Sequence, residues 1–528
     1  MSDRPLLRPR HPGGATWRRL VEVTGAQPFG EPAADRVSGI SLDSRQVGPG
    51  DLYVGLPGTR SHGARFTPEA VAAGAVAVLT DAEGARTVAE LTTADPPAAD
   101  PADAVPVLVA EDPRVAMALA AAEVFGHPAS TMTTLGITGT NGKTTTAYLV
   151  EAGLLAAGRH PGSIGTIGFR LDGQELPSAR TTVTTPESPD LQALFAVMAE
   201  QGASDVVMEV SSHALALHRV DATVFDVVAF TNLGRDHLDF HHTLEEYFEA
   251  KARLFTPELA RRAVVNVDDP HGVELVRRLR EGGRVEVVTT SMEADSDYRI
   301  ESWHPDEGLR ARAEVSTPSG RRELVVGLPG MFNVRNAVTA LAVLESAGLD
   351  FEEVAGGLAG AAVPGRMEPV RLGEGAPQVL VDFAHTPQAI SSALTAARTA
   401  TRGRVIAVVG AGGDRDAAKR GPMGEAAARG ADVVVVTDDN PRTEDPALIR
   451  AAVLDGAHNV SGAVVVDGGE RRSAIAEALA IAGPDDLVCV LGKGHETGQQ
   501  VGHDILDFDD KVVAAQEWQA IAPKEDHD

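Results

Sequence analysis

The feature that most constrains the fold of this chain is a glycine-rich loop between an expected strand and an expected helix. Residues 135–146 read Leu-Gly-Ile-Thr-Gly-Thr-Asn-Gly-Lys-Thr-Thr-Thr. A β-rich run over 132–137 precedes the loop, and the apolar spacing predicts a helix over about 145–157. Glycines at such a turn let the backbone approach an anion, and the helix N-terminus adds partial positive charge. The stretch predicts a phosphate-binding loop, although an unliganded glycine turn is the alternative.

The residue types in this loop fit the binding of a nucleotide with Mg²⁺. Gly139 and Gly142 permit the close approach, Lys143 supplies a point charge and Thr144 offers a hydroxyl to the metal ion. The spacing is shorter than the common pattern, because Ile137 stands six residues before the lysine where that pattern has glycine.

Length and charge limit the possible architectures and partners. A chain of 528 residues exceeds what one hydrophobic core usually supports, and three domains are predicted. The chain has 47 lysines and arginines against 75 aspartates and glutamates, a net charge of −28. A field of this sign repels nucleic acid and anionic membranes, so no nucleic-acid partner is expected and anionic ligands must be held by local positive sites.

The lack of targeting signals and the single cysteine bear on the expected location of the protein. No apolar run approaches the roughly 18 residues that span a bilayer, and the segment 4–14 lacks the apolar region of a signal peptide. The single cysteine, Cys489, lies in the apolar run 487–491, which indicates a buried thiol. We therefore expect no membrane insertion, a cytoplasmic location and, by default, a monomer.

Helices alternate with apolar strands along most of the chain, which predicts an α/β fold with parallel sheets. Strands are expected at 205–210, 226–231 and 263–267, and, after a boundary near Pro364, at 378–383, 404–409, 432–437 and 486–491. The predicted domains are 1–130, a central P-loop ATPase domain over 131–364 and a Rossmann-like domain over 365–528. Residues 1–15 are expected to form a disordered tail, and 92–104 a surface loop.

Polar residues follow most of these strands, where ligands bind open α/β sheets. Glu209 ends one strand and is a candidate Mg²⁺ ligand, although a strand-end glutamate is often only solvated. The segment 231–242 holds His237, His241 and His242; a zinc site is one interpretation and a polar capping turn is another. Lys251 lies on an apolar helix face; most such lysines extend to solvent, but a desolvated amine could react with CO₂ to give an anionic metal ligand.

Taken together, these motifs closely resemble the Mur ligase family, ATP-dependent amide-forming enzymes of peptidoglycan synthesis, over nearly the whole chain. The shared motifs are the short loop 138–144, Glu-Val-Ser-Ser-His at 209–213, Thr-Asn-Leu at 231–233 with Asp-His-Leu-Asp at 236–239, and the helix 247–255. The resemblance implies transfer of the ATP γ-phosphate to a D-glutamate carboxylate. The acyl phosphate is then attacked by an acceptor amine.

The resemblance also implies a role for each matched residue. Lys143, Glu209, His237 and Lys251, the last as a carbamate, are the expected catalytic groups, and Mg²⁺ is assigned to Thr144, Glu209, His237 and Lys251. The ATP-binding residues are expected to be Gly139, Thr140, Asn141, Gly142, Lys143, Thr144, Thr145, Asn333, Asn336, Arg366 and Asp382. Leu42, Ser44 and the loop 59–61 resemble the part that receives the uridine nucleotide of the substrate UDP-MurNAc-dipeptide, and Thr184, Thr185, Ser211 and Arg219 match positions that hold its muramoyl-dipeptide end.

The last domain resembles family members that add diaminopimelate rather than lysine. The signature is Asp439, Asn440, Pro441 and Arg442, and Arg415, Gly492 and Glu496 match the other acceptor contacts. Diaminopimelate carries a distal carboxylate that arginines hold through paired N–H donors and a distal ammonium that a glutamate balances. One departure is Leu217, where the family pattern has glutamine.

Three other functions remain as alternatives. The same ligation with L-lysine and a folylpolyglutamate-synthetase-type ligase are the near ones, and a P-loop switch or motor protein belongs to another class. The choice between meso and LL diaminopimelate is open at this stage.

Overall fold

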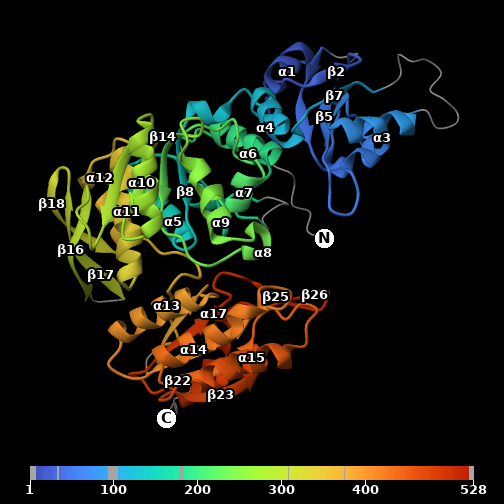
Figure 1. The fold of residues 1–528 in the computed structure, drawn as a ribbon. Helices are drawn as coiled ribbons and strands as arrows, with labels where there is room; N and C mark the ends of the chain where they lie inside the picture. The colour runs from blue at the N-terminus through green and yellow to red at the C-terminus, as the bar shows by residue number, and fades with distance from the viewer. Residues whose placement is uncertain are drawn as a thin grey trace, which may run out of the picture.

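The chain folds into three α/β domains that follow one another along the sequence (Figure 1). The computed structural model describes residues 8–32, 35–92, 105–177, 183–306, 309–373 and 375–521. Most of the predicted surface loop 92–104 lies outside these ranges. The predicted fold class, with a central parallel-sheet domain and a Rossmann-like domain after it, is confirmed. No helix within the described ranges is long and apolar enough to cross a membrane.

The first domain is built on a five-stranded sheet in the order β2-β7-β6-β5-β4. Its strands are β2 (Gln27–Phe29), β4 (Gly39–Ser41), β5 (Asp51–Gly55), β6 (Ala77–Thr80) and β7 (Val107–Val109), and β1 (Ala15–Thr16) pairs separately with β3 (Arg36–Val37). The helices are α1 (Trp17–Thr24), α2 (Thr67–Ala72), α3 (Ala82–Thr92) and α4 (Pro113–Val124).

The expectation of a tail without structure up to residue 15 is wrong for the described part of that segment. The Arg8 guanidinium pairs with the buried Asp51 carboxylate at 2.6 Å. The backbone amides of Arg10 and His11 donate to the Glu200 carboxylate at 2.9 and 2.8 Å. The segment therefore connects the first sheet to α6 (Ser188–Glu200) of the central domain, through contacts that a reading of local periodicity cannot find.

The central domain holds an eleven-stranded sheet in the order β11-β10-β9-β12-β8-β13-β14-β15-β16-β17-β18. The seven strands from β9 to β16 pair in parallel, and antiparallel strands extend both edges. The strands are β8 (Thr133–Thr138), β9 (Pro161–Gly165), β10 (Gly168–Leu171), β11 (Gln174–Glu175), β12 (Asp205–Glu209), β13 (Phe225–Phe230), β14 (Ala260–Asn266), β15 (Glu286–Ser291), β16 (Tyr298–Asp306), β17 (Arg310–Thr317) and β18 (Gly320–Val326).

Helices cover both faces of this sheet over its inner strands, so β8, β9, β12 and β13 are almost entirely buried. Helices α5 (Lys143–Ala156), α11 (Met331–Ser346) and α12 (Phe351–Gly360) pack on one face. Helices α6, α9 (Leu244–Ala252) and α10 (Pro270–Gly282) pack on the other, with the shorter α7 (Ser212–Ala216) and α8 (Leu238–His241) beside them. Alternate residues of β8 divide between the two faces, and Leu135 and Ile137 face α5.

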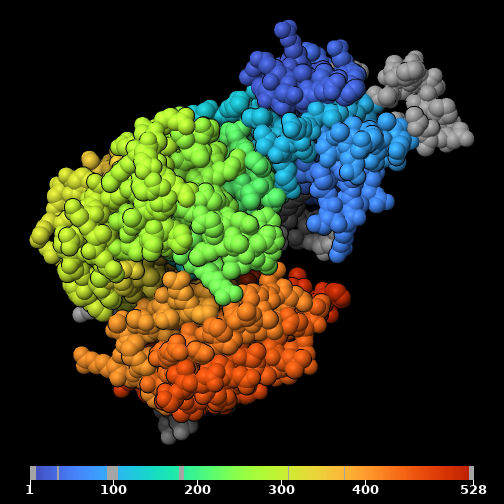
Figure 2. Space-filling view, in the orientation of Figure 1, coloured from blue at the N-terminus to red at the C-terminus, as the bar shows by residue number. Residues whose placement is uncertain are grey.

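The last domain has a six-stranded sheet in the order β19-β20-β24-β21-β22-β23, parallel except for the edge pair β19–β20. Its strands are β19 (Glu368–Val370), β20 (Gln378–Asp382), β21 (Val405–Ala411), β22 (Val433–Asp438), β23 (Val464–Gly469) and β24 (Leu487–Leu491), and a hairpin follows, β25 (Gly498–Val501) with β26 (Asp504–Asp507). The helices are α13 (Pro387–Ala400), α14 (Arg420–Gly430), α15 (Pro446–His458), α16 (Arg471–Ile481) and α17 (Asp510–Ile521). On the visible face, this domain lies against the central domain and apart from the first (Figure 2).

Candidate active site

The glycine loop after β8 has the geometry of a phosphate-binding turn. Gly139 has φ +147°, and a Cβ there would lie 1.9 Å from Thr231 Oγ1. Gly142 has φ +87°, and a Cβ there would lie 2.4 Å from Asn336 Oδ1. Only glycine fits either position, because side chains are excluded both by the backbone conformation and by the neighbouring atoms.

The end of β13 holds the loop from one side. Asn232 accepts from the Thr140 amide with its backbone oxygen at 2.8 Å and from the Asn141 amide with Oδ1 at 3.0 Å. Helix α5 begins at Lys143, two residues before the predicted start, and Gly142 provides no side-chain cap. The first amides of an uncapped helix have no intrahelical acceptor, so they are available to an anion in the cleft.

The Lys143 amine and the Thr144 hydroxyl make contacts on different sides of the loop. Lys143 Nζ folds back on the loop and donates to the oxygens of Gly139 and Thr140 at 3.0 and 2.9 Å, and burial lowers the pKa of this amine. Thr144 Oγ1 donates to Glu209 Oε2 at 2.8 Å. The loop thus places its hydroxyl against a carboxylate.

Glu209 is a buried carboxylate whose environment suits a divalent cation. It is 1% exposed. Besides the Thr144 hydroxyl, it accepts from the Thr166 amide at 2.8 Å and from the Thr166 hydroxyl at 3.1 Å. All three donors are neutral, and within the described ranges no cation lies at ion-pair distance. A buried anion with only neutral donors fits a Mg²⁺ ion, which binds few protein oxygens together with water and phosphate.

Lys251 is buried on the apolar side of α9, as the helical spacing indicated. It is 2% exposed, its Nζ donates to Gly139 O at 2.8 Å, and it lies 4.5 Å from the centre of the Tyr247 ring. In the part of the chain that the structure covers, no carboxylate pairs with it. Burial, and then the charge of Lys143, hold the pKa of this amine well below its usual range. Both effects favour the neutral form of this amine, which lies beside the phosphate loop.

The histidines of 231–242 divide into two environments. His237 lines the cleft, has φ +54°, and lies 3.6 Å from the Asp236 carboxylate. Burial lowers its pKa to about 4, so its ring is neutral. His241 is buried and its Nε2 lies 2.8 Å from Ser212 Oγ. The capping turn considered for His241 is thus a tertiary contact between α8 and α7.

These elements meet at a cleft of about 720 Å³ between the central and last domains. Fourteen of the predicted site residues line it: Thr140, Asn141, Gly142, Lys143, Thr144, Thr145, Thr184, Glu209, Ser211, His237, Lys251, Asn336, Arg366 and Asp382. The last domain contributes Phe383, His385 and Gln388 as well. Strand ends from two sheets therefore meet at this cleft, those of β8, β12 and β13 from the central domain and that of β20 from the last domain.

The residues expected near adenine and ribose lie on both sides of this cleft. Asn333 and Asn336 stand at the start of α11, and Asn336 Nδ2 donates to Asn333 Oδ1 at 3.3 Å. Asn333 is fully packed and does not line the cleft. Arg366 lies over the Phe383 ring at 4.5 Å and reaches Thr144 Oγ1 at 3.4 Å. Asp382 accepts from the Met367 amide at 2.7 Å, and burial raises its pKa.

The residues matched to the muramoyl-dipeptide form a polar network at one end of the cleft. Thr185 Oγ1 accepts from the Ser211 amide at 3.0 Å and donates to Glu209 O at 2.9 Å. Thr184 Oγ1 lies 3.1 Å from the Thr166 hydroxyl, and Arg219 binds the Thr185 carbonyl and Glu187. Leu217, at the position of the expected glutamine, is half-buried, and its carbonyl accepts from Arg114 of the first domain at 3.5 Å.

The acceptor residues gather away from this cleft, at the carboxyl ends of β21, β22 and β24. Arg442 has φ +51° and donates to Gly413 O at 2.6 Å, and a Cβ on Gly412 would lie between Arg442 and Arg415. Asn440 Nδ2 donates to Glu496 Oε2 at 2.9 Å. Pro441 lies between Asn440 and Arg442, and Gly492, with φ +113°, packs against Asp439. The structure brings these residues together with one another, and none of them lines the cleft. The loop that carries Gly492 and Glu496 does pass the edge of the cleft, where the His495 ring lies 5.2 Å from the ring of Phe383.

The first-domain residues are separate from both groups. Ser44 is buried and donates to the Glu69 carboxylate at 2.9 Å, and Leu42 packs partly on the domain core. Thr59 and Arg60 are exposed.

Two kinds of residue that support the candidate sites are not among those predicted from the sequence. Thr166 holds both oxygens of Glu209; it follows β9, and its position after a strand was the available signal. Lys493 and Arg471 lie beneath the acceptor residues, and no local pattern distinguishes a buried cation that supports a site from an exposed one.

Comparison with known proteins agrees with this geometry. Three family models match in order: the Mur ligase family, catalytic domain, over residues 36–124; the Mur ligase middle domain over 137–344; and the Mur ligase, glutamate ligase domain over 365–494. The chain belongs to the Mur ligase family.

Within that family, the chain is similar to proteins named UDP-N-acetylmuramoyl-L-alanyl-D-glutamate--2,6-diaminopimelate ligase. The one from Streptomyces coelicolor is 48% identical over 502 residues, covering 92% of this chain and 94% of that one. The one from Corynebacterium glutamicum is 43% identical over 496 residues, 92% of each chain. A solved structure with the same name superposes with a TM-score of 0.66 at 29% identity, covering 96% of this chain and 99% of the other.

Proposed function

We propose that this chain is an ATP-dependent ligase that adds diaminopimelate to UDP-N-acetylmuramoyl-L-alanyl-D-glutamate in peptidoglycan precursor synthesis. The observation that carries the acceptor assignment is the pair Arg415 and Arg442. Among the described residues neither has an ion-pair partner, although Arg442 is half-buried and the charge of Arg415 contributes to lowering its pKa. Two adjacent guanidinium groups without a carboxylate suit a ligand that supplies one. The names of the relatives support the same assignment.

ATP and Mg²⁺ are the expected co-substrate and metal ion at the phosphate loop. The residues proposed to hold the phosphates are those of 139–145, with Asn333, Asn336, Arg366 and Asp382 around the adenine and ribose. Thr144 and Glu209 are proposed to hold Mg²⁺, together with His237 and a carbamate on Lys251. The metal ion neutralises the charge of the nucleotide and the substrate carboxylate.

The carbamate rests on the environment of Lys251. A neutral primary amine adds CO₂ to form an N–C bond and releases a proton, which gives an anion. The site offers a buried amine that has no carboxylate partner among the described residues and lies close to the proposed phosphate loop. A carbamate on Lys251 would add a second negative charge to that of Glu209 for binding the metal ion.

The remaining predicted residues are assigned to the UDP-linked substrate and to the acceptor amino acid, and they lie in different domains. We assign the uridine nucleotide to Leu42, Ser44 and the loop 59–61, and the muramoyl-dipeptide to Thr184, Thr185, Ser211 and Arg219. Diaminopimelate is assigned to Arg415, Asn440, Arg442, Gly492 and Glu496, with Asp439 and Pro441 shaping the loop. Boundaries near residues 130 and 364 and a monomer as the active unit belong to the same proposal.

In this arrangement the acceptor loops must approach the phosphate loop before the amine can attack. The acceptor residues do not line the 720 Å³ cleft. Closure of the last domain on the central one would bring the amine to the phosphorylated carboxylate and exclude water.

The test is an ATP-dependent ligation assay that offers meso-diaminopimelate, LL-diaminopimelate and L-lysine in parallel. We expect a tripeptide product, with ADP and phosphate, from a diaminopimelate isomer and much less from lysine. Better use of lysine would refute the acceptor assignment. Ligation of glutamate to a folate would favour the folylpolyglutamate-type alternative, and nucleotide hydrolysis independent of both substrates would favour a switch or motor protein.

A further inference from the structure

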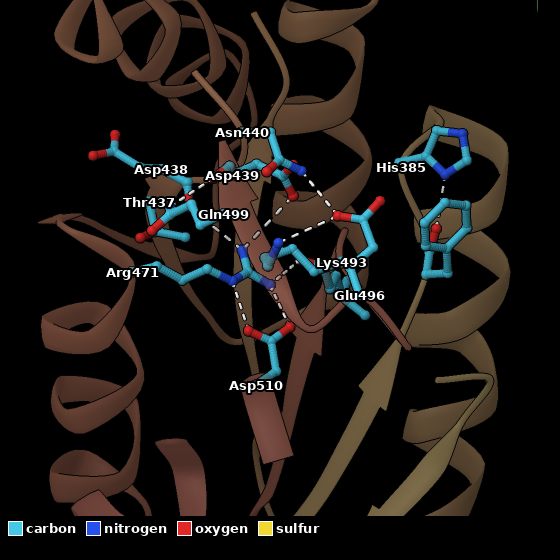
Figure 3. A network of polar contacts seen from close by, with 12 residues as sticks. His385, Thr437, Asp438, Asp439, Asn440, Arg471, Lys493, Glu496, Gln499 and Asp510 are labelled. Carbon is cyan, nitrogen blue, oxygen red and sulfur yellow. Dashed lines mark hydrogen bonds and ion pairs between the residues drawn. The ribbon is translucent and has the colours of Figure 1, made fainter. Parts of the chain in front are cut away.

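Two cations are fully buried beneath the acceptor residues of the last domain. Lys493 and Arg471 are 0% and 1% exposed. Figure 3 shows the Lys493 ammonium between the Arg471 guanidinium and the Glu496 carboxylate, with Asn440 above them and Asp510 below. Burying a charge is expensive unless partners hold it in place, so the position of each cation is set by its contacts.

Arg471 ties the ends of β22 and β24, which lie on either side of β21 in the sheet, to helix α17. It forms two hydrogen bonds with the Asp510 carboxylate, both at 2.7 Å, and Asp510 is fully buried at the start of α17. The same guanidinium donates to the carbonyl of Leu491 at 3.0 Å and reaches that of Asp438 at 3.5 Å. The Leu491 carbonyl directly precedes Gly492, and the Asp438 carbonyl directly precedes Asp439. Gly492 and Asp439 begin the two acceptor loops, which are the loops after β24 and β22 that carry the predicted acceptor contacts.

Lys493 connects the acceptor loop that begins at Gly492 to the β25–β26 hairpin that follows it. Its Nζ lies 3.2 Å from Glu496 Oε2 and donates to Gly498 O at 2.5 Å. Asn440 Nδ2 donates to the same Glu496 oxygen. Two donors therefore hold Oε2, whereas Oε1 has no donor among the described residues and is available to a ligand ammonium.

Asp439 faces the buried cations and not the acceptor. It is 9% exposed, and its Oδ2 lies 3.9 Å from Arg471 Nη1 with no hydrogen-bond donor in the described part of the chain. A Cβ on Gly492 would lie 2.5 Å from this oxygen. The Asp439 carboxylate is thus packed between Gly492 and Arg471, inside the loop.

We infer that Lys493 and Arg471 are positioning residues that determine the choice of acceptor amino acid. This inference rests on the proposed function. Lys493 holds Glu496 away from the guanidinium of Arg442, and Arg471 fixes the spacing between the two loops. The site then presents separated charges, with Arg415 and Arg442 for a carboxylate and Glu496 Oε1 for an ammonium.

The separation matters because Glu496 already lies within electrostatic range of Arg442. Without the Lys493 ammonium, Glu496 would lose its charged partner and could pair with Arg442. That pair would occupy the guanidinium needed for the distal carboxylate of diaminopimelate. The binding of lysine, which has no distal carboxylate, would be weakened less.

The experiment compares Lys493→Met and Lys493→Arg with the wild type and with Arg472→Met as a matched control. Arg472 neighbours Arg471 in sequence, but its side chain is 49% exposed and pairs with Glu517 at the surface. For K493M we expect the KM for diaminopimelate to rise about 10-fold to 100-fold, as for a lost hydrogen bond to a charged group. We expect KM for ATP and for the UDP-linked substrate to stay within about twofold.

The preference for diaminopimelate over lysine should fall in K493M, recover partly in K493R and stay unchanged in R472M. A uniform rise in all three KM values would show a general structural role and overturn the inference, as would an unchanged KM for diaminopimelate. If K493M does not fold, Gln499→Ala tests how the β25–β26 hairpin, which Lys493 also contacts at Gly498 O, is held to the Asp439 loop, because Gln499 Nε2 donates to Asp439 O at 2.6 Å. Absence of ligation by the wild type would instead refute the proposed function.

Discussion

Replacing Lys251 with methionine separates the stability of the central domain from its chemistry. In the folded protein, the Lys251 amine makes one N–H···O bond to Gly139 O inside an apolar helix face. Methionine has a similar length and no polar head to desolvate. The substitution therefore removes the amine that CO₂ would modify and leaves the packing nearly intact.

The magnitudes follow from those contacts. Loss of one hydrogen bond costs about 0.5–1.5 kcal/mol, and relief of the buried amine opposes this cost, so the melting temperature of K251M should stay within a few degrees of the wild type. Lys251→Ala leaves a cavity as well, and truncation of a long buried side chain costs about 2–5 kcal/mol. Ligation by either variant should fall by about 100-fold to 1,000-fold or more, as when one preorganised charge-stabilising group is removed.

The assay measures ligation rate, melting temperature and intact mass on the same preparations. Wild-type protein should carry the added mass of CO₂ and lose activity in CO₂-free buffer, then regain it with bicarbonate. K251M should show neither the added mass nor a response to bicarbonate. A fully active wild-type enzyme without the modification, or a K251M variant that keeps most of its activity, would refute the carbamate.

Three further predictions concern the loop, the acceptor and pH. Gly142→Ala should weaken ATP binding at least about 10-fold, since a left-handed residue costs roughly 1–2 kcal/mol and the new Cβ would meet the Asn336 side-chain amide. Gly158→Ala, at φ +71° with nothing within 4 Å of the new Cβ, is the control for backbone strain alone. Equal ATP affinity in both variants would contradict the steric argument. Arg442→Lys keeps the charge but loses the planar fork, so KM for diaminopimelate should rise about 10-fold or more with KM for ATP unchanged, and an unchanged selectivity against lysine would count against the acceptor site. Burial lowers the pKa of His241 to about 4 from 6.5; its contribution to stability is complete above 6.5 and is lost as the pH falls toward 4, so the drop in melting temperature from pH 7 to pH 5 should be smaller in His241→Asn but unchanged in a variant of the exposed His503.

The sequence predicts the parallel core of the fold well, because each inner strand is a short apolar run followed by polar residues. It does not predict the antiparallel strands β16 to β18. Their inner residues, such as Ala311, Ala313 and Val315, alternate with arginine and glutamate, so these strands are not the continuous apolar runs by which the parallel strands are identified. They pair with strands adjacent in sequence, as successive antiparallel neighbours at one edge of the sheet. The contact of the 8–15 segment with the central domain joins residues 189 and 190 positions apart, and pairing at that separation leaves no local signal.

Motifs identify the candidate ligand-binding residues better than the residues that hold those candidates in place. Gly142, Thr144 and Glu209 stand in recognisable short motifs, and the structure places them at one cleft. Thr166 and Arg471 act through tertiary contacts to Glu209 and to strand-end carbonyls. Their residue types are common at surfaces, so only the fold distinguishes them.

The charge distribution explains how a chain of net charge −28 can bind two anionic nucleotides. The cleft keeps Lys143 and Arg366 partly desolvated, and burial lowers the pKa of both. Neither forms an ion pair with a carboxylate in the described ranges. Phosphates entering the cleft would restore the partners that these cations lack, and Mg²⁺ would do the same for Glu209. Binding of the nucleotide with its metal ion should therefore stabilise the protein more than either component alone, because each compensates a buried charge that the other leaves unpaired.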